Sequence, residues 1–151
     1  MKKTSLFVSL FFASLALLAS TASLAQTTAV GLWQSFDNST GAPRAEIRIT
    51  ESEGVLTGRI ERNLLPQTSG AVQVCDKCTD DRKGAPLIGM ALVRNVKASQ
   101  EVGVWDGGEI LDPDEGKIYR LRLQLLDGGK KLQVRGYIGP FFKNRTWIRV
   151  G

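Results

Sequence analysis

Apolar and polar residues alternate along most of this chain, in short runs that are separated by turn residues. The clearest run is Pro43–Thr50, where apolar residues occupy every second position from Ala45 to Ile49 and charged residues stand between them. A period of two places neighbouring side chains on opposite faces of a β-strand. This run is therefore predicted to be a strand with one face in the core and the other in solvent.

Similar runs recur along the chain, and no segment shows the period of an amphipathic helix. The longest series is Gly103–Gly139, which is predicted to form three strands joined by tight turns at Asp112–Gly116 and Asp127–Gly129. Turn residues of this kind between alternating runs indicate antiparallel hairpins. About eight strands are expected in all: Val30–Phe36, Pro43–Thr50, Val55–Arg62, Leu87–Val96, Gly103–Ile110, Lys117–Leu125, Lys131–Ile138 and Arg145–Val150.

Short strands at this regular spacing indicate an all-β domain, either a sandwich or an antiparallel up-and-down barrel. The barrel is favoured because closure removes the exposed edges that an open sheet would leave. A barrel of about eight strands has an interior that is filled by side chains or holds one small ligand. The one long interruption, Asn63–Pro86, is expected to be a loop, and a loop of this length in a compact domain is usually functional, tied down or mobile.

Residues 1–25 have the pattern of a secretory signal peptide. Lys2 and Lys3 form a positive start, Leu6–Ala19 is an apolar run, and Ser23–Ala25 places small residues at a cleavage site. The alternative is an uncleaved membrane anchor, but the apolar run is shorter than the roughly 20 residues that span a bilayer. We therefore expect a mature protein of one domain, residues 26–151, that is exported to the periplasm or secreted and has no stable membrane insertion.

Charge gives little support to a polyanionic partner. The net charge of +5 falls to +3 when Lys2 and Lys3 leave with the signal peptide. Arginines lie on most of the predicted strands, as they do on nucleic-acid-binding OB-folds. Glu46 and Glu61 interrupt this basic face, however, so solvated outer faces explain the arginines better. No nucleic-acid partner is predicted.

Cys75 and Cys78 are the only cysteines of the chain, and they lie in the expected loop. Three interpretations compete: a structural disulfide, a thiol–disulfide exchange site and half of a metal site. Exchange sites place the first cysteine at a helix N-terminus, whereas the following residues, Thr79–Pro86, do not have a helical pattern. A tetrahedral metal site needs a second pair of ligands. A disulfide is favoured, in agreement with export to an oxidising compartment.

The chain contains no histidine, which excludes the common acid–base arrangements and most metal-ligand sets. Acidic residues cluster between Asp106 and Glu115, and paired carboxylates can hydrolyse glycosides or hold calcium. Their spacing matches neither chemistry, and a solvated turn explains Asp112–Glu115. Asp106 lies between a tryptophan and two glycines, so it is kept as a candidate polar group at the mouth of a pocket. No cofactor and no metal site are predicted.

A set of residues distributed over the whole expected domain matches one known pattern. These residues are Gly31–Trp33, the segment Asp37–Arg44, Cys75–Cys78, Trp105–Gly108, Asp112-Pro113, Gly116-Lys117, Tyr119, Asp127-Gly128, Leu132–Tyr137, Gly139 and Thr146-Trp147. Together they resemble the bacterial domain-of-unknown-function 2147 family. The resemblance implies an exported bacterial protein with a β-barrel of the lipocalin or calycin type. Because that family has no established activity, the resemblance carries over no catalytic residue.

A second resemblance concerns the two ends of the domain. Lipocalin-like barrels often place Gly-x-Trp on the first strand and an arginine of the last strand across the tryptophan face. Here Gly31–Trp33 opens the domain, and Arg145 and Arg149 lie in the last expected strand. Such an arginine over Trp33 would close one end of the barrel by a cation–π contact. An ordinary core tryptophan is the alternative.

Three functions from different classes remain, in this order. The first is an exported barrel that binds a small hydrophobic or amphipathic ligand. The second is a non-enzymatic structural or interaction protein of the cell envelope that acts through residues 63–86. The third is a thiol-based enzyme. The candidate ligand-binding residues, which ordinary core packing also explains in part, are Trp33, Trp105, Asp106, Tyr119, Tyr137 and Trp147.

Overall fold

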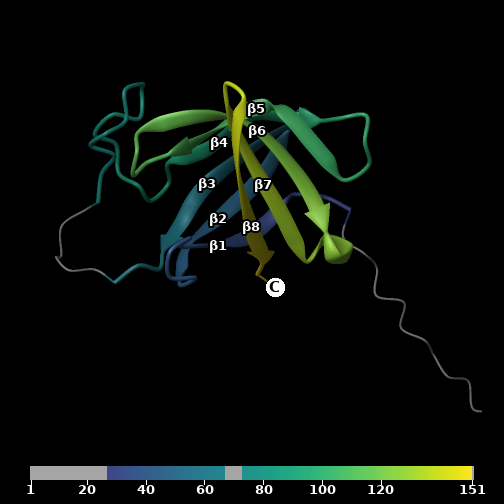
Figure 1. Ribbon diagram of the computed structural model, residues 1–151, viewed down its shortest axis with the longest axis horizontal. Helices are drawn as coiled ribbons and strands as arrows, with labels where there is room; N and C mark the ends of the chain where they lie inside the picture. Colours follow the sequence, from purple (N-terminus) through teal and green to yellow (C-terminus); the bar gives the residue numbers. More distant parts are fainter. Residues whose placement is uncertain (1–26, 67–72, 151) are drawn as a thin grey trace, which may run out of the picture.

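A computed structural model describes residues 27–66 and 73–150, and in these ranges eight antiparallel strands close into one barrel (Figure 1). The expected signal peptide lies outside the described residues. Each strand pairs with the next one along the chain, and β1 also pairs with β8. The strands are β1 Gly31–Phe36, β2 Pro43–Ser52, β3 Val55–Asn63, β4 Ala91–Ala98, β5 Val104–Asp112, β6 Lys117–Leu126, β7 Lys131–Ile138 and β8 Phe141–Arg149. The predicted fold class is thereby confirmed.

Two of the expected strand starts are wrong by four residues, and several other limits differ by one or two. The fourth strand was expected from Leu87, but β4 begins at Ala91. The backbone N–H of Leu87 instead bonds to the carbonyl of Gln73 in the loop, at 2.9 Å, and the N–H of Met90 bonds back to Leu87, at 3.1 Å. Residues 87–90 therefore belong to the β3–β4 loop, and the strand extends to Ala98.

The last strand was expected from Arg145, but β8 begins at Phe141. Phe141 pairs with Ile138, so β7 and β8 form a tight hairpin around Gly139 and Pro140. Proline is tolerated there because a turn position needs no ladder N–H. The earlier start of β8 adds residues 141–144 to the strand. Alternation then places Lys143 and Arg145 on the same face as Trp147.

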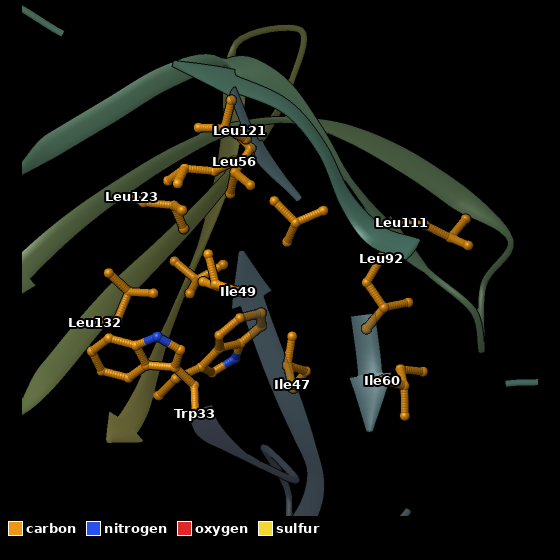
Figure 2. Close-up of a cluster of buried hydrophobic side chains, with 14 of the residues drawn as sticks. Trp33, Ile47, Ile49, Leu56, Ile60, Leu92, Leu111, Leu121, Leu123 and Leu132 are labelled. Carbon is orange, nitrogen blue, oxygen red and sulfur yellow. The ribbon is translucent and has the colours of Figure 1, made fainter. Parts of the chain in front are cut away.

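The core lies inside the barrel, where alternate residues of the strands meet (Figure 2). Figure 2 shows Trp33, Ile49 and Leu132 gathered near one end of the barrel, with Leu111 well apart from them. The largest fully buried side chains are Trp33, Ile47, Ile49, Leu56, Leu123, Leu132, Val93 and Val96. Burial of this apolar set is the main driving force for the fold.

The meander gives the barrel two different ends. The β1–β2, β3–β4, β5–β6 and β7–β8 connections lie at one end, which we call the mouth end. The two chain ends of the domain and the remaining connections, including the 3-10 turn Asp127–Gly129, lie at the other, which we call the closed end. The described residues contain no helix that is long and apolar enough to cross a bilayer.

Candidate ligand-binding site

Trp33 and Arg149 seal the closed end. The Trp33 side chain is fully buried, and its Nε1 donates a hydrogen bond of 2.8 Å to the carbonyl of Ala29. The Arg149 guanidinium lies 4.1 Å from the centre of the Trp33 ring. It also donates to the carbonyls of Thr28, Val30 and Gly129. The predicted cation–π contact is confirmed, with Arg149 as its cation.

A cavity of about 510 Å³ lies at the mouth end, inside the barrel. This volume is within the usual range for small-molecule sites. Gly136 contributes to the space, because a Cβ at this position would lie 3.1 Å from the Cβ of Tyr119 and crowd its ring. The apolar part of the wall includes Ala45, Ile47, Ile60, Leu92, Ile110, Leu111, Val134 and Trp147.

The deep part of the cavity offers no unsatisfied polar group. Ser35 lines it, but its hydroxyl donates to the carbonyl of Ala45 at 3.2 Å. Across residues 27–66 and 73–150, every buried side-chain nitrogen and oxygen has a hydrogen-bond partner. A polar ligand group placed there would lose its hydrogen bonds to water without replacement. The deep part therefore suits an apolar group.

The rim is polar, and Arg44 ties two of its loops together. Ser35 pairs with Ala45 but Phe36 pairs with Pro43, so Arg44 is the extra residue of a β-bulge. Bulges redirect side chains, and this one accompanies an ion pair between Arg44 and Asp114 of the β5–β6 turn. Because β2 and β5 are not neighbours in the barrel, the pair links separate parts of the rim.

Lys143, Glu115 and Tyr119 form a second polar group at the rim. The Tyr119 hydroxyl donates to Glu115 Oε2 at 2.8 Å, and Lys143 Nζ lies 3.3 Å from Glu115 Oε1 and 3.2 Å from the Tyr119 oxygen. Hydrogen bonds from Tyr119 first, and then from Lys143, lower the pKa of Glu115 to about 2. Hydrogen bonds to Tyr119 first, and then to Glu115, raise the pKa of Lys143. Glu115 and Lys143 are thus a carboxylate and an ammonium at neutral pH.

The described part of the β3–β4 loop is fixed to the barrel. The predicted disulfide between Cys75 and Cys78 is present, and both residues are buried. Arg82 is also buried, and its guanidinium binds Asp80 at 2.6 Å, Glu109 of β5 at 3.1 Å and the carbonyl of Ala91 at 2.9 Å. The burial of Arg82 was not predicted, because a charged cluster from Asp76 to Lys83 has the pattern of a solvated loop.

The six predicted ligand-binding residues lie in different parts of the barrel. Tyr119 and Trp147 line the cavity. Trp33 lies at the closed end, and Trp105 is buried in the core outside the cavity lining. The other two are Asp106, which is exposed on β5, and Tyr137, which is on β7 with the Arg120 guanidinium 5.9 Å from its ring centre.

Three cations of the cavity lining were not among the predicted ligand-binding residues: Arg44, Lys143 and Arg145. Lys143 and Arg145 lie on the same face of β8 as Trp147. The late start assigned to the last strand left out Lys143, while Arg145 was inside the expected strand but was considered only as a possible partner of Trp33, a place that Arg149 takes. The position of Arg44 at the rim depends on a β-bulge, and nothing in the sequence around Arg44 predicts a bulge.

The fold and the cavity define a lipocalin-like β-barrel with a space for one small ligand. Residues 31–149 match the family described as uncharacterized protein conserved in bacteria (DUF2147), and the chain belongs to this family. Its fold is similar to that of protein HP1028 from the human pathogen Helicobacter pylori, which is described as belonging to the lipocalin family. The TM-score is 0.69 at 13% sequence identity, over 83% of this chain and 85% of that one. No curated protein matches the chain.

Proposed function

We propose that this protein is exported and binds one small hydrophobic or amphipathic ligand in the mouth-end cavity. The observation that carries the proposal is the cavity itself, about 510 Å³ inside a closed barrel, with apolar side chains at depth and polar ones at the rim. Such a combination is typical of small-molecule sites. The similarity to a lipocalin-family protein supports the same class of function.

Export is part of the proposal and is supported by two features. Residues 1–25 have the pattern of a signal peptide. The Cys75–Cys78 disulfide fits an oxidising compartment, where such bonds form and persist. Expression of the full chain with a C-terminal tag, followed by fractionation and mass spectrometry, tests this part. A protein that keeps residues 1–25 in the cytoplasm would contradict it.

The ligand experiment uses the intrinsic fluorescence of the mature protein, residues 26–151. Trp147 is the tryptophan that lines the cavity, so ligands that enter should change its emission. A panel of lipids and hydrophobic metabolites is titrated, and we expect saturable binding by some members. Trp147→Phe should remove most of the signal change while binding persists in calorimetry.

A variant that fills the cavity supplies the decisive comparison. Ala45 lines the cavity on β2, and Ala45→Leu should weaken binding about tenfold or more, which equals about 1.4 kcal/mol. The matched control is Thr50→Leu on the same strand, because Thr50 is exposed. The proposal fails if no compound in the panel binds, or if Ala45→Leu binds as tightly as Thr50→Leu.

A further inference from the structure

Arg145 is the one cation of the cavity lining that has no side-chain carboxylate within 4.0 Å in residues 27–66 and 73–150. Its guanidinium donates to the adjacent carbonyl of Asn144 at 3.0 Å. The other two cations are paired, Arg44 with Asp114 and Lys143 with Glu115. All aspartates and glutamates of the sequence fall within the described ranges. No acidic side chain from the remaining residues is therefore available to Arg145.

Arg145 also lies farther into the barrel than the acidic residues of the rim. It is the fifth of the nine residues of β8 and pairs with Val134 of the cavity wall. Asp112 is the last residue of β5, where one of its oxygens accepts the backbone N–H groups of Asp114 and Glu115. The guanidinium thus stands between the polar rim and the apolar depth of the cavity.

A half-buried guanidinium without a counter-ion has a desolvation cost that a bound anion would offset. Its planar arrangement of donors fits a carboxylate through two parallel hydrogen bonds. Beyond Arg145 on the same face of β8 lies Trp147, at the apolar part of the wall. An anionic group at Arg145 would therefore have its attached chain directed to apolar side chains.

We propose that the ligand is an amphipathic anion, a carboxylate with an apolar chain, whose carboxylate binds Arg145 and whose chain occupies the cavity near Trp147. This inference rests on the proposed ligand-binding function and adds the chemical class of the ligand.

The test compares dodecanoate, dodecanol and dodecylamine on the mature protein, at a pH where the acid is ionised. Wild type should bind dodecanoate about tenfold to hundredfold more tightly than dodecanol, as expected for a charge-assisted hydrogen bond. Arg145→Gln should remove this preference and leave the affinity for dodecanol unchanged. The control is Arg59→Gln, an exposed arginine on β3 that does not line the cavity and, like Arg145, donates to a backbone carbonyl; it should keep the preference.

The outcomes separate this inference from the function on which it rests. Equal binding of acid and alcohol by wild type, tighter binding of the amine, or an unchanged preference in Arg145→Gln would overturn the role of Arg145 while leaving a ligand-binding barrel. Absence of binding by all three compounds would overturn the inference, and the wider ligand panel would then decide the proposed function separately.

An independent observation concerns the tip of the β7–β8 hairpin, which projects at one edge of the barrel (Figure 1). Ile138, Phe141 and Phe142 are 47%, 73% and 55% exposed there. Two cations flank these side chains: Arg135 lies 5.0 Å from the Phe142 ring centre, and Arg120 stacks on Tyr137. Neither has a side-chain carboxylate within 4.0 Å among the described residues.

Exposed aromatic rings beside unpaired arginines are complementary to the surface of an anionic bilayer, with rings at the level of the headgroups and arginines on the phosphates. We infer that the hairpin tip docks on a membrane that contains anionic phospholipids. Because the hairpin belongs to the mouth end, docking would bring the cavity entrance to the lipid surface.

Vesicle sedimentation tests the docking inference. Wild type should sediment with vesicles that contain phosphatidylglycerol and much less with pure phosphatidylcholine, and salt should weaken the binding. Phe141→Ser/Phe142→Ser should lose most of it. Val102→Ser is the matched control, since Val102 is 97% exposed at the closed end. Equal sedimentation of the double variant and the control, or binding to neither vesicle, would overturn the inference.

Discussion

The backbone of the β5–β6 turn lies close to the disulfide segment at Gly116. A Cβ at this position would lie 1.9 Å from the carbonyl oxygen of Lys77, and the φ angle of Gly116 is +67°. Gly139 also has a positive φ, +53°, but a Cβ there would meet nothing within 4 Å. A substitution at Gly139 therefore measures the destabilisation caused by the backbone conformation alone. A substitution at Gly116 adds the destabilisation caused by the contact with Lys77.

We expect Gly139→Ala to lower the free energy of unfolding by about 1 kcal/mol, the cost of a left-handed conformation for a residue with a Cβ. Gly116→Ala should cost clearly more, because a backbone carbonyl cannot move aside as a flexible side chain can. Urea denaturation of both variants measures the difference. Equal losses would show that the disulfide segment does not rest on this turn.

Glu115 provides a pH-dependent prediction at the rim. Its pKa is lowered from 4.5 to about 2 by the Tyr119 hydroxyl and by Lys143, so the folded state binds this proton less readily than the unfolded chain. The resulting stabilisation is complete above pH 4.5 and disappears as the pH falls to about 2. Wild type should therefore be more stable than Glu115→Gln at pH 6, with the difference vanishing near pH 2 in denaturation curves. A constant difference would contradict the prediction.

Single residues show how far a sequence can be interpreted. Trp33 was predicted to meet an arginine of the last strand, because Gly31–Trp33 and Arg149 occupy fixed places at the ends of the barrel. Arg82 was missed, since its burial depends on Glu109 and Ala91, which are distant in sequence. Contacts fixed by position in the fold could be predicted, and contacts made by a folded loop could not.

At the scale of elements, strand centres were predicted better than strand ends. Alternation identified the central part of all eight strands, because the inward face must be apolar. It failed at the mouth end, where inward positions of β8 carry Lys143 and Arg145 and so lack the expected pattern. The failure lies at the site for a physical reason, since a ligand site needs polar groups where a core strand would have apolar ones.

The β3–β4 loop gives a prediction at the same scale. Replacing Cys75 and Cys78 with alanine removes a cross-link across a very short loop, for which chain entropy gives about 2 kcal/mol. Hydrogen exchange should accelerate mainly in residues 73–90, while Arg82 keeps the segment attached to β4 and β5. Affinity for an apolar ligand should change little, because neither cysteine lines the cavity. Loss of binding in this variant would instead assign the disulfide to the site.

At the scale of the whole molecule, closure depends on the seam between β1 and β8. These strands pair at two positions, Trp33 with Arg149 and Gln34 with Ile148, whereas β7 and β8 pair at eight. Arg149 strengthens the seam through its hydrogen bonds to Thr28 and Val30 and its contact with Trp33. The sequence predicted a closed barrel, but it did not show that the contacts of one side chain, Arg149, stabilise so much of the β1–β8 seam.

Arg149→Lys tests this account of closure. A lysine keeps the charge but loses the planar fork that bonds to three carbonyls and covers the indole ring. We expect a loss of about 2 kcal/mol or more in the free energy of unfolding, with faster hydrogen exchange in β1. Arg48→Lys is the control, because Arg48 forms an exposed ion pair with Glu61 that is worth about 0–1 kcal/mol. If both variants lose the same stability and β1 stays protected, the barrel is closed by its backbone pairing and core alone.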